Sequence, residues 1–409
     1  LGVGEQLTLV IPYTVTDGDN DSITRNITIT ITGTNDGPVA EADTGLVSEA
    51  GVRSGGNGLF IGAPIALGNV LGNDTDVDHD AVLRVHGVSA GDAGGSDVNG
   101  GVGTIVNGTY GWLVLGANGG WVYTLDNTRA ATQALGANTN AGVATGFDVF
   151  SYTVKDEHGA PSTTTLTIKV DGTNDRPTIA LLQSDLSGQF TEDASSATRG
   201  EVVFHDPDAG DTHEVSLSLG AVVRGSGVPS SAMPDNATLL SWFKASVTDT
   251  TSGPGGLGRV EWTFEPGDVD FLGQGRRFSV VVNLTITDAD GASSTVPVLV
   301  TVTGTNDAPE ITGSVNPAAV AEVLGDSSEQ NLLVTGGSLT VSDADWGDTL
   351  TPSVKGNAIA LLNGDPLPSG VDIDALLSSG AIRFSSAQTS NGGDRTFNWT
   401  YDTNAADLD

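Results

Sequence analysis

The sequence has no cysteine, one methionine, and only 16 Lys and Arg residues among 409. The absence of cysteine excludes disulfides, thiol catalysis and cysteine-ligated zinc or iron–sulfur sites. With 51 acidic residues the net charge is −35, which argues against nucleic-acid binding and against docking on anionic lipid without a bridging divalent cation. No apolar run reaches about 18 residues and no charged-then-apolar leader is present, so we expect no membrane insertion, and any export signal would lie outside these residues.

The abundant residues indicate a β-rich, turn-rich chain. Glycine occurs 56 times, Thr and Val recur throughout, and 38% of the residues are hydrophobic, enough for several small cores. A charged fraction of 16% argues against plain disorder. The length predicts two to four domains.

A Gly-Thr-Asn-Asp-x-Pro motif occurs three times, at residues 33–38, 172–177 and 304–309. The motif aspartates recur at nearly equal intervals along the chain, which is typical of tandem repeats. A second aspartate, at the end of an alternating apolar block, precedes each motif aspartate by the same number of residues. Asp17, Asp156 and Asp288 precede Asp36, Asp175 and Asp307 in this way.

The blocks before each motif predict β-hairpins. Apolar residues alternate along residues 7–15, 150–154 and 278–286, which places them on one face of a strand. An Asp- and Gly-rich turn and a second alternating run follow each block. The proline of the motif ends strand pairing, so each motif predicts a domain boundary.

The fold class that follows is all-β, with tandem β-sandwich domains in an elongated array. The aromatic strands, such as residues 121–125 and 262–264, are interpreted as sandwich core. We predict a C-terminal hairpin of a sandwich in residues 1–36, complete sandwiches in 37–175 and 176–307, and an incomplete sandwich lacking its last hairpin in 308–409.

The two ends of the sequence are predicted to complement each other. Joined tail to head, residues 407–409 and 1–4 reproduce the segment 268–275 short of one Phe, and the repeat interval across the join is close to the other two. We expect one period of a longer array, in which residues 1–36 complete the preceding repeat of the same covalent chain or, alternatively, a neighbouring subunit by donor-strand exchange. A chain interrupted in mid-domain would instead leave an open core and exposed edges.

Carboxylates gather at equivalent positions of the repeats. The clusters are Asp76, Asp78 and Asp80; Asp206, Asp208 and Asp211; and Asp343, Asp345 and Asp348, preceded by Glu49, Glu192 and Glu322 respectively. Two carboxylates about 4 Å apart repel by roughly 1 kcal/mol in water and about 4 kcal/mol at an intermediate dielectric constant. A bound Ca²⁺, which takes about six to eight oxygen ligands, would remove that repulsion, whereas Mg²⁺ would want more water.

Other interpretations of these acidic residues were weighed. Asp and Asn also form Asx-turns and solvated loops without any metal. Residues 17–21 begin like an EF-hand loop, but Ser22 stands where Gly is needed and Thr28 where Glu is needed. The turns at Asp17 and Asp288 are therefore weaker candidates, and five scattered histidines without cysteine disfavour zinc.

Several segments resemble VCBS-type repeats, the cadherin-like modules of giant bacterial surface adhesins. The resemblance rests on residues 108–115, 119–126, 150–154 and the closing Gly-Thr-Asn-Asp, and it is most specific across residues 38–175. It extends more loosely over most of the chain. The resemblance implies tandem Ig-like or cadherin-like sandwiches that are secreted, often stabilised by Ca²⁺, and act as extender stalks in adhesion and biofilm formation.

The boundary motif is also similar to the cadherin linker, whose Asn and Asp help bind calcium between domains. Carried over, the resemblance suggests linker ligands at Asn35, Asp36, Asn174, Asp175, Asn306 and Asp307. Glu49, Glu192 and Glu322 resemble the cadherin glutamate near the start of a domain. Gly stands two residues before the Asn where cadherins carry an acid, and Arg176 adds a positive charge, so the resemblance implies a weaker or metal-free site there.

Three classes of function were compared. The favoured one is a calcium-stiffened stalk at the bacterial cell surface, whose partners are adjacent repeats of the same protein. A carbohydrate-binding module would use Trp112, Trp121, Trp242 or Trp346, with surface glycans or matrix components as partners. An enzyme is disfavoured because the carboxylate pairs recur at every boundary and His205 and His213 lack a nucleophile at a recognisable spacing.

Overall fold

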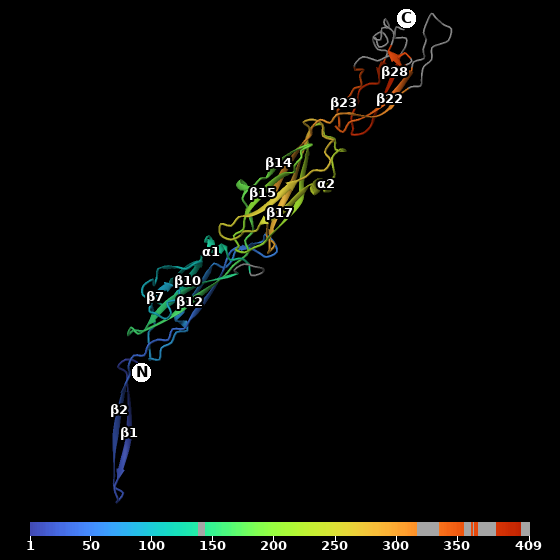
Figure 1. Cartoon of the computed structure of the whole chain (residues 1–409). Coiled ribbons are helices and arrows are strands. Elements are labelled where there is room, and N and C mark those ends of the chain that lie inside the picture. The colour runs from blue at the N-terminus through green and yellow to red at the C-terminus, as the bar shows by residue number, and fades with distance from the viewer. Residues whose placement is uncertain (138–143, 317–334, 356–360, 363, 367–381, 402–409) are drawn as a thin grey trace, which may run out of the picture.

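The computed structural model describes residues 1–137, 144–316, 335–355, 361–362, 364–366 and 382–401. These residues form a line of separate β-sheets, with the β1–β2 hairpin at one end and β28 at the other (Figure 1). Among them, helix is confined to α1 (Ala130–Gln133), α2 (Asn236–Ser241) and two 3₁₀ turns, so the predicted all-β class is confirmed. No helix of the described part is long and apolar enough to span a bilayer.

The first element is a hairpin of β1 (Gln6–Thr16) and β2 (Ser22–Thr32), which pair antiparallel from Gln6 with Thr32 to Thr16 with Ser22. Every residue of both strands is exposed. The alternation predicted from the sequence places apolar side chains on one face, where six of them are 41–50% exposed: Leu7, Leu9, Ile11, Ile27, Ile29 and Ile31. This hairpin therefore has an uncovered apolar face.

The first sandwich contains two four-stranded sheets, ordered β6-β10-β9-β8 and β3-β12-β11-β7. Its strands are β3 (Asp43–Ser48), β6 (Ile65–Asn69), β7 (Arg84–Ala90), β8 (Ile105–Asn107), β9 (Gly111–Leu115), β10 (Gly120–Leu125), β11 (Thr145–Lys155) and β12 (Pro161–Asp171). Inward residues of both sheets, such as Leu113, Phe150 and Ile168, share one core and are fully buried. A separate small hairpin of β4 (Gly51–Val52) and β5 (Leu59–Phe60) follows β3.

The second sandwich repeats this plan with sheets ordered β13-β15-β18-β17 and β14-β20-β19-β16. Its strands are β13 (Thr178–Ile179), β14 (Ser187–Thr191), β15 (Thr198–His205), β16 (His213–Arg224), β17 (Phe243–Asp249), β18 (Gly258–Phe264), β19 (Arg277–Asp288) and β20 (Ser293–Thr303). As in the first sandwich, the first strand of the hairpin-containing sheet runs parallel to the last, with β3 beside β12 and β14 beside β20.

The described residues of the third unit include a four-stranded sheet ordered β21-β22-β28-β26. Its described strands are β21 (Glu310–Val315), β22 (Thr335–Ser342), β23 (Thr349–Leu350), β24 (Leu361–Leu362), β25 (Asp365–Pro366), β26 (Ile382–Phe384), β27 (Gln388–Thr389) and β28 (Arg395–Tyr401). Among the described residues the buried core here consists of Val341, Leu350 and Phe397.

A glycine–tryptophan pair identifies the same sheet in all three units. Trp121, Trp262 and Trp399 lie opposite Gly68, Gly200 and Gly337 on the neighbouring strand. A Cβ added to these glycines would lie 2.8, 2.4 and 2.9 Å from the Cζ2 atom of the facing indole. The third-unit sheet therefore corresponds to β13-β15-β18-β17 of the second sandwich.

Candidate metal centre

Each of the three linkers makes the same contact with an Asp-x-Asp loop of the next unit. The linker aspartate donates its backbone N–H to a carboxylate oxygen of the second loop aspartate. The three contacts are Asp36 to Asp78 Oδ2 at 2.9 Å, Asp175 to Asp208 Oδ2 at 2.7 Å, and Asp307 to Asp345 Oδ2 at 3.0 Å. We call these places the first, second and third junctions.

Local sequence explains this contact. The proline two residues after each linker aspartate cannot join a strand ladder, so the linker aspartate keeps a backbone N–H free for the loop. In each loop the first aspartate accepts the N–H of the second in an Asx-turn, which fixes the second carboxylate against the linker. These turns are 2.9 Å at Asp76, 3.0 Å at Asp206 and 3.0 Å at Asp343.

Each junction leaves buried carboxylate oxygens without a hydrogen-bond partner. They include Asp78 Oδ1, Asp208 Oδ1 and Asp345 Oδ1, together with Asp175 Oδ2 and Asp307 Oδ2. Buried polar atoms are nearly always hydrogen-bonded, and leaving one unpaired costs about 1–3 kcal/mol, or more when it is charged. A repeated set of such oxygens, all at linkers, is the arrangement that a hard cation would satisfy.

The second junction holds the tightest carboxylate group of the described chain. One oxygen each of Asp206, Asp211 and Asp288 lies within 4.8 Å of the others, and all three residues are buried. The Asn174 amide donates to Asp288 Oδ2 at 3.1 Å, while its own carbonyl oxygen has no partner and is buried. Oxygen atoms from the linker, the Asp-x-Asp loop and the β19–β20 turn therefore meet in one place.

Glu49 of the first sandwich adds a further carboxyl group beside this site. It follows β3, is completely buried, and accepts a hydrogen bond from Gln133 Nε2 at 2.8 Å. Burial, reinforced by the carboxylates of Asp175 and Asp208, raises the pKa of Glu49 to about 9. Without a cation this side chain holds its proton at neutral pH.

The neighbouring aspartates show the same effect. Burial raises the pKa of Asp208 to about 9, with the carboxylates of Asp206 and Asp175 adding to it. Burial and Asp206 raise the pKa of both Asp175 and Asp211 to about 6. A bound cation would stabilise the ionised form of these buried carboxylates.

His213 contacts the carboxylate centre through Asp206. Its Nε2 lies 3.0 Å from Asp206 Oδ2, and both side chains are fully buried. The imidazole packs edge-on against Phe204, with ring centroids 4.6 Å apart. The sequence placed this histidine beside an acidic loop but gave no sign that it contacts Asp206.

The third junction is built similarly around Glu192. Burial, together with Asp307 and Asp270, raises the pKa of Glu192 to about 7, and its Oε2 accepts the N–H of Thr305 at 2.7 Å. Burial and Asp348 raise the pKa of Asp345 to about 6. Asp348 also lies 3.7 Å from the Arg276 guanidinium, and the predicted ligand Glu322 lies outside the described residues.

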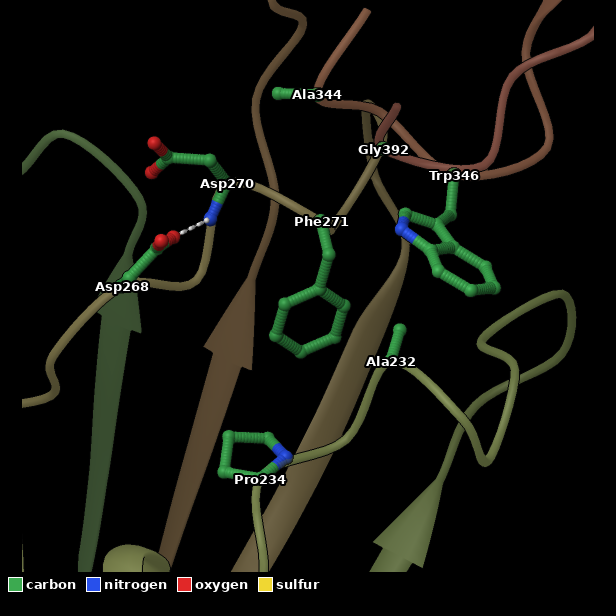
Figure 2. Close-up of a pocket in the computed structure, with 8 residues that line it drawn as sticks. All are labelled: Ala232, Pro234, Asp268, Asp270, Phe271, Ala344, Trp346 and Gly392. Carbon is green, nitrogen blue, oxygen red and sulfur yellow. Dashed lines mark hydrogen bonds between the residues drawn. The ribbon is translucent and has the colours of Figure 1, made fainter. Parts of the chain in front are cut away.

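A groove beside the third junction is lined by residues of the second and third units. Figure 2 shows Phe271 and Trp346 at a cavity of about 420 Å³, with Asp268 and Asp270 beyond Phe271. Trp346 is half-buried, whereas Trp121 belongs to the sandwich core as the sequence predicted. Trp242, a candidate for carbohydrate binding, is also buried in a core.

The first junction is more open. Asp36 is exposed, Asp76 and Asp78 are half-buried, and Asn35 donates to Asp156 Oδ2 at 2.8 Å. Asp80 lies at the surface, where its carboxylate is 3.1 Å from His79 Nδ1, and it is the predicted ligand that the structure does not place with the loop carboxylates. Asp74 lies nearby in sequence but contacts Glu41, whose N–H it accepts at 2.9 Å, and burial together with Asp43 raises its pKa to about 6.

The sequence analysis underrated or missed three aspartates as candidate residues of the junctions. Asp288 was only a weak candidate and Asp156 was not chosen, yet each turn aspartate receives the linker asparagine of its junction. Asp270 was not chosen as a ligand, although it adds to the raised pKa of Glu192. The signal available was the repeat itself, because both turn aspartates precede a linker aspartate at the same spacing.

Arg176 was expected to weaken the second junction. The structure places it at the surface, and no ion pair joins it to a junction carboxylate within the described residues. The carboxylate group next to it is nevertheless the most tightly gathered of the three. The arginine charge therefore does not neutralise this centre.

The described chain is thus a series of cadherin-like β-sandwich units, with an Asn-Asp linker against an Asp-x-Asp loop at each junction. Residues 35–172 match the family model of the bacterial cadherin-like domain. No curated protein sequence matches the chain.

Solved protocadherin and cadherin structures were also found to be similar. They include PcdhgB3 EC1-4 (14% identity, 98% of this chain and 75% of that one, TM-score 0.41) and protocadherin gamma B2 cadherin domains 3–6 (14%, 96% and 82%, 0.36). Mouse cadherin-23 EC22-24 matches with 13% identity over 73% of this chain and 74% of that one, at a TM-score of 0.33.

Proposed function

We propose that this chain is an extender segment of a bacterial surface adhesin or filament, located outside the cell and stiffened by Ca²⁺ at its domain junctions. In this role the repeats hold a binding tip away from the cell during adhesion or biofilm formation. The repeated linker contact carries the proposal, because all three junctions leave buried carboxylate oxygens unpaired in equivalent positions.

Calcium fits the donor set better than other ions. At the second junction the available donors are carboxylate and amide oxygens, from Glu49, Asn174, Asp175, Asp206, Asp208, Asp211 and Asp288. Calcium accepts such all-oxygen sets in flexible geometry, and it would supply positive charge where the carboxylates repel one another. Since these donors come from two sandwiches, binding would tie the linker to both.

The direct test is calcium titration of the chain after chelation, followed by calorimetry. We expect two or more calcium ions to bind, and Asp208→Asn to abolish the site at the second junction while leaving the third intact. Asp92→Asn is the matched control, since it makes the same charge change in an exposed Asx-turn of the first sandwich. Absence of calcium binding, or equal loss in the control, would reject the metal part of the proposal.

A second candidate function, carbohydrate binding, is supported by the groove in Figure 2, where the half-buried Trp346 and Phe271 lie near two carboxylates. Aromatic rings can stack on sugar faces while carboxylates accept hydroxyl hydrogen bonds. A glycan array probed with the chain and with Trp346→Ala tests this. A flat response from both would remove the candidate and would not affect the structural role.

A further inference from the structure

We propose that the sheet edge formed by β6 pairs with β6 of a second copy of this chain, antiparallel and across a twofold axis at Leu67. The pairing joins the β6-β10-β9-β8 sheets of two first sandwiches into one continuous sheet. It uses no junction carboxylate, so it does not require calcium.

The outer edge of β6 has backbone groups available for pairing. The Pro64 carbonyl accepts the N–H of Leu125, at the end of β10, at 2.8 Å. Within the described residues β6 pairs with β10 alone. Because backbone groups alternate in direction along a strand, the N–H and C=O groups that point away from β10 are those of Ile65, Leu67 and Asn69.

The second sandwich covers the corresponding edge with its own chain. Residues 180–186 connect β13 with β14 and run beside β15. There Asp185 donates its N–H to the Glu201 carbonyl at 2.7 Å, and its own carbonyl accepts the indole N–H of Trp262 at 2.8 Å. Extended backbone thus occupies the outer edge of β15.

The connection in the first sandwich is shorter. Val39 pairs with Thr75, and residues 40–42 then lead directly into β3. Among the described residues, the indole N–H of Trp121, the counterpart of Trp262, has no hydrogen-bond acceptor. The edge that the second sandwich fills with its own backbone is therefore free for another extended strand.

An apolar row on the outer face of the sheet reaches this edge. Its members pair with one another across the four strands, and they are Leu67, Val122, Val114 and Ile105. Leu67 is 75% exposed and Ile105 is 63% exposed, although each could have been polar at no cost to the core. A row of exposed apolar side chains on one sheet indicates a contact surface.

The same positions are polar in the other two units. Aligned on the glycine–tryptophan pair, the counterparts of Leu67, Val122 and Val114 are Arg199, Thr263 and Lys244 in the second sandwich and Gly336, Thr400 and Arg383 in the third unit. With a net charge of −35, two copies repel each other over most of their surfaces. This uncharged edge is a place where they can meet.

β6 is complementary to itself in the proposed register. With Leu67 on the axis, Ile65 faces Asn69 of the second copy, and all the residues that meet have backbone groups pointing outward. On the outer face the two apolar rows become one, with Leu67 beside Leu67. A second copy therefore satisfies both the open backbone and the exposed row, in the symmetric manner of a twofold dimer.

The pairing fixes the relative direction of the two copies. Ala63, just before β6, pairs with Ser48 next to Glu49 of the second junction, and the chain after β6 leads to Asp78 of the first. β6 thus runs along the line of units, and antiparallel pairing places the two copies in opposite directions. In the proposed extender role, on which this consequence alone rests, the contact would link stalks that approach from facing surfaces.

Sedimentation velocity over a range of concentrations, in calcium and in EDTA, tests the association. We expect a monomer–dimer equilibrium in the micromolar range in both, because the contact is small. Leu67→Asp should leave monomers, since the two new carboxylates would face each other across the axis. Val223→Asp is the matched control, because Val223 is 59% exposed on the edge strand β16, and it should associate as the parent does.

Double electron–electron resonance tests the register. The chain has no cysteine, so a nitroxide can be attached to Ile105→Cys alone. In the dimer the two labelled positions are seven strand spacings apart, which is roughly 34 Å. We expect a distance distribution near this value that disappears when Leu67→Asp is added. Monomers at every concentration, dimers that persist in Leu67→Asp, or dimers without this distance would overturn the proposal.

Discussion

At the second junction, one Asp208 oxygen accepts the N–H of Asp175 and the other is buried without a partner. The Asp therefore positions the linker whether or not a metal is bound. Its second oxygen makes no hydrogen bond, and burying a carboxylate oxygen without a partner costs free energy. This division between a positioning oxygen and a free oxygen recurs in Asp78 and Asp345.

The raised pKa values predict how stability depends on pH. Glu49 and Asp208 have pKa values of about 9 in the folded chain, above those of an unfolded Glu or Asp. The metal-free folded state thus retains protons that the unfolded state loses, so its free energy of unfolding falls as pH rises from about 4.5 to about 9. The slope is up to about 1.4 kcal/mol per pH unit for each retained proton.

Urea denaturation in EDTA at several pH values measures this slope. Excess calcium should flatten it, because a bound cation favours the deprotonated carboxylates. A metal-free chain whose stability rises with pH over this range would contradict the prediction.

Glu49→Gln should have opposite effects on two quantities. In EDTA at pH 8 it should raise the free energy of unfolding, because the amide removes a buried acid next to Asp175 and Asp208 while keeping an oxygen for the Gln133 amide. In calcium it should weaken binding at the second junction. Chemical denaturation and calorimetry measure the two effects, and a variant that lost stability in EDTA would show that Glu49 acts structurally.

At the scale of elements, the sequence was sufficient to predict the hairpins. Alternation and turn chemistry located all three, and the motif that follows each lies outside the strands, since β2, β12 and β20 end at Thr32, Asp171 and Thr303. These local patterns can be recognised in the sequence because each strand buries only one face, so apolar and polar residues alternate.

Contacts between units could not be predicted in this way. The β4–β5 hairpin reaches the second sandwich, where Asn57 exchanges hydrogen bonds of 3.0 and 2.9 Å with Ser293. The contact joins residues 236 positions apart, and no periodicity or motif in the sequence specifies it. Asp288 was likewise underrated because its link to Asn174 exists only across the junction.

Gly200→Ala should destabilise the second sandwich. The added Cβ would lie 2.4 Å from Trp262 Cζ2 in a packed core, where overpacking costs about 1–3 kcal/mol. Gly72→Ala is the control, because no atom lies within 4 Å of its added Cβ. Differential scanning calorimetry should show a lowered melting temperature for the first variant alone, and equal melting of both would contradict the packing argument.

For the whole molecule, a line of sandwiches with a net charge of −35 has to resist its own repulsion at every linker. Direct contacts help at each junction, and at the first His79 Nδ1 lies 3.7 Å from Glu5 Oε1. The β4–β5 hairpin bridges the second, and Arg276 spans the third by donating to the carbonyl oxygens of Gly227 and Trp346. The first junction has the most exposed linker aspartate and should be the most flexible.

Chelation should loosen the rod. We expect small-angle X-ray scattering to give a shorter maximum dimension and a broader distance distribution in EDTA than in calcium, because uncompensated carboxylates destabilise the linkers. Restoring calcium should reverse the change, and magnesium at equal concentration should do so less well. An identical scattering envelope in both conditions would show that the direct contacts alone set the stiffness.

The parallel pairing of β3 with β12, and of β14 with β20, bears on how the chain responds to tension. In the first sandwich β3 is the first strand after the incoming linker and β12 the last strand before the outgoing one, so a pull on the two ends slides these strands past each other. In the second sandwich β13 lies between the linker and β14. All the hydrogen bonds between β3 and β12 then share the load and must rupture together, whereas strands peeled from one end break bonds in turn. In the proposed role as a surface extender, the first sandwich would therefore carry tension along a strand pair that resists shear.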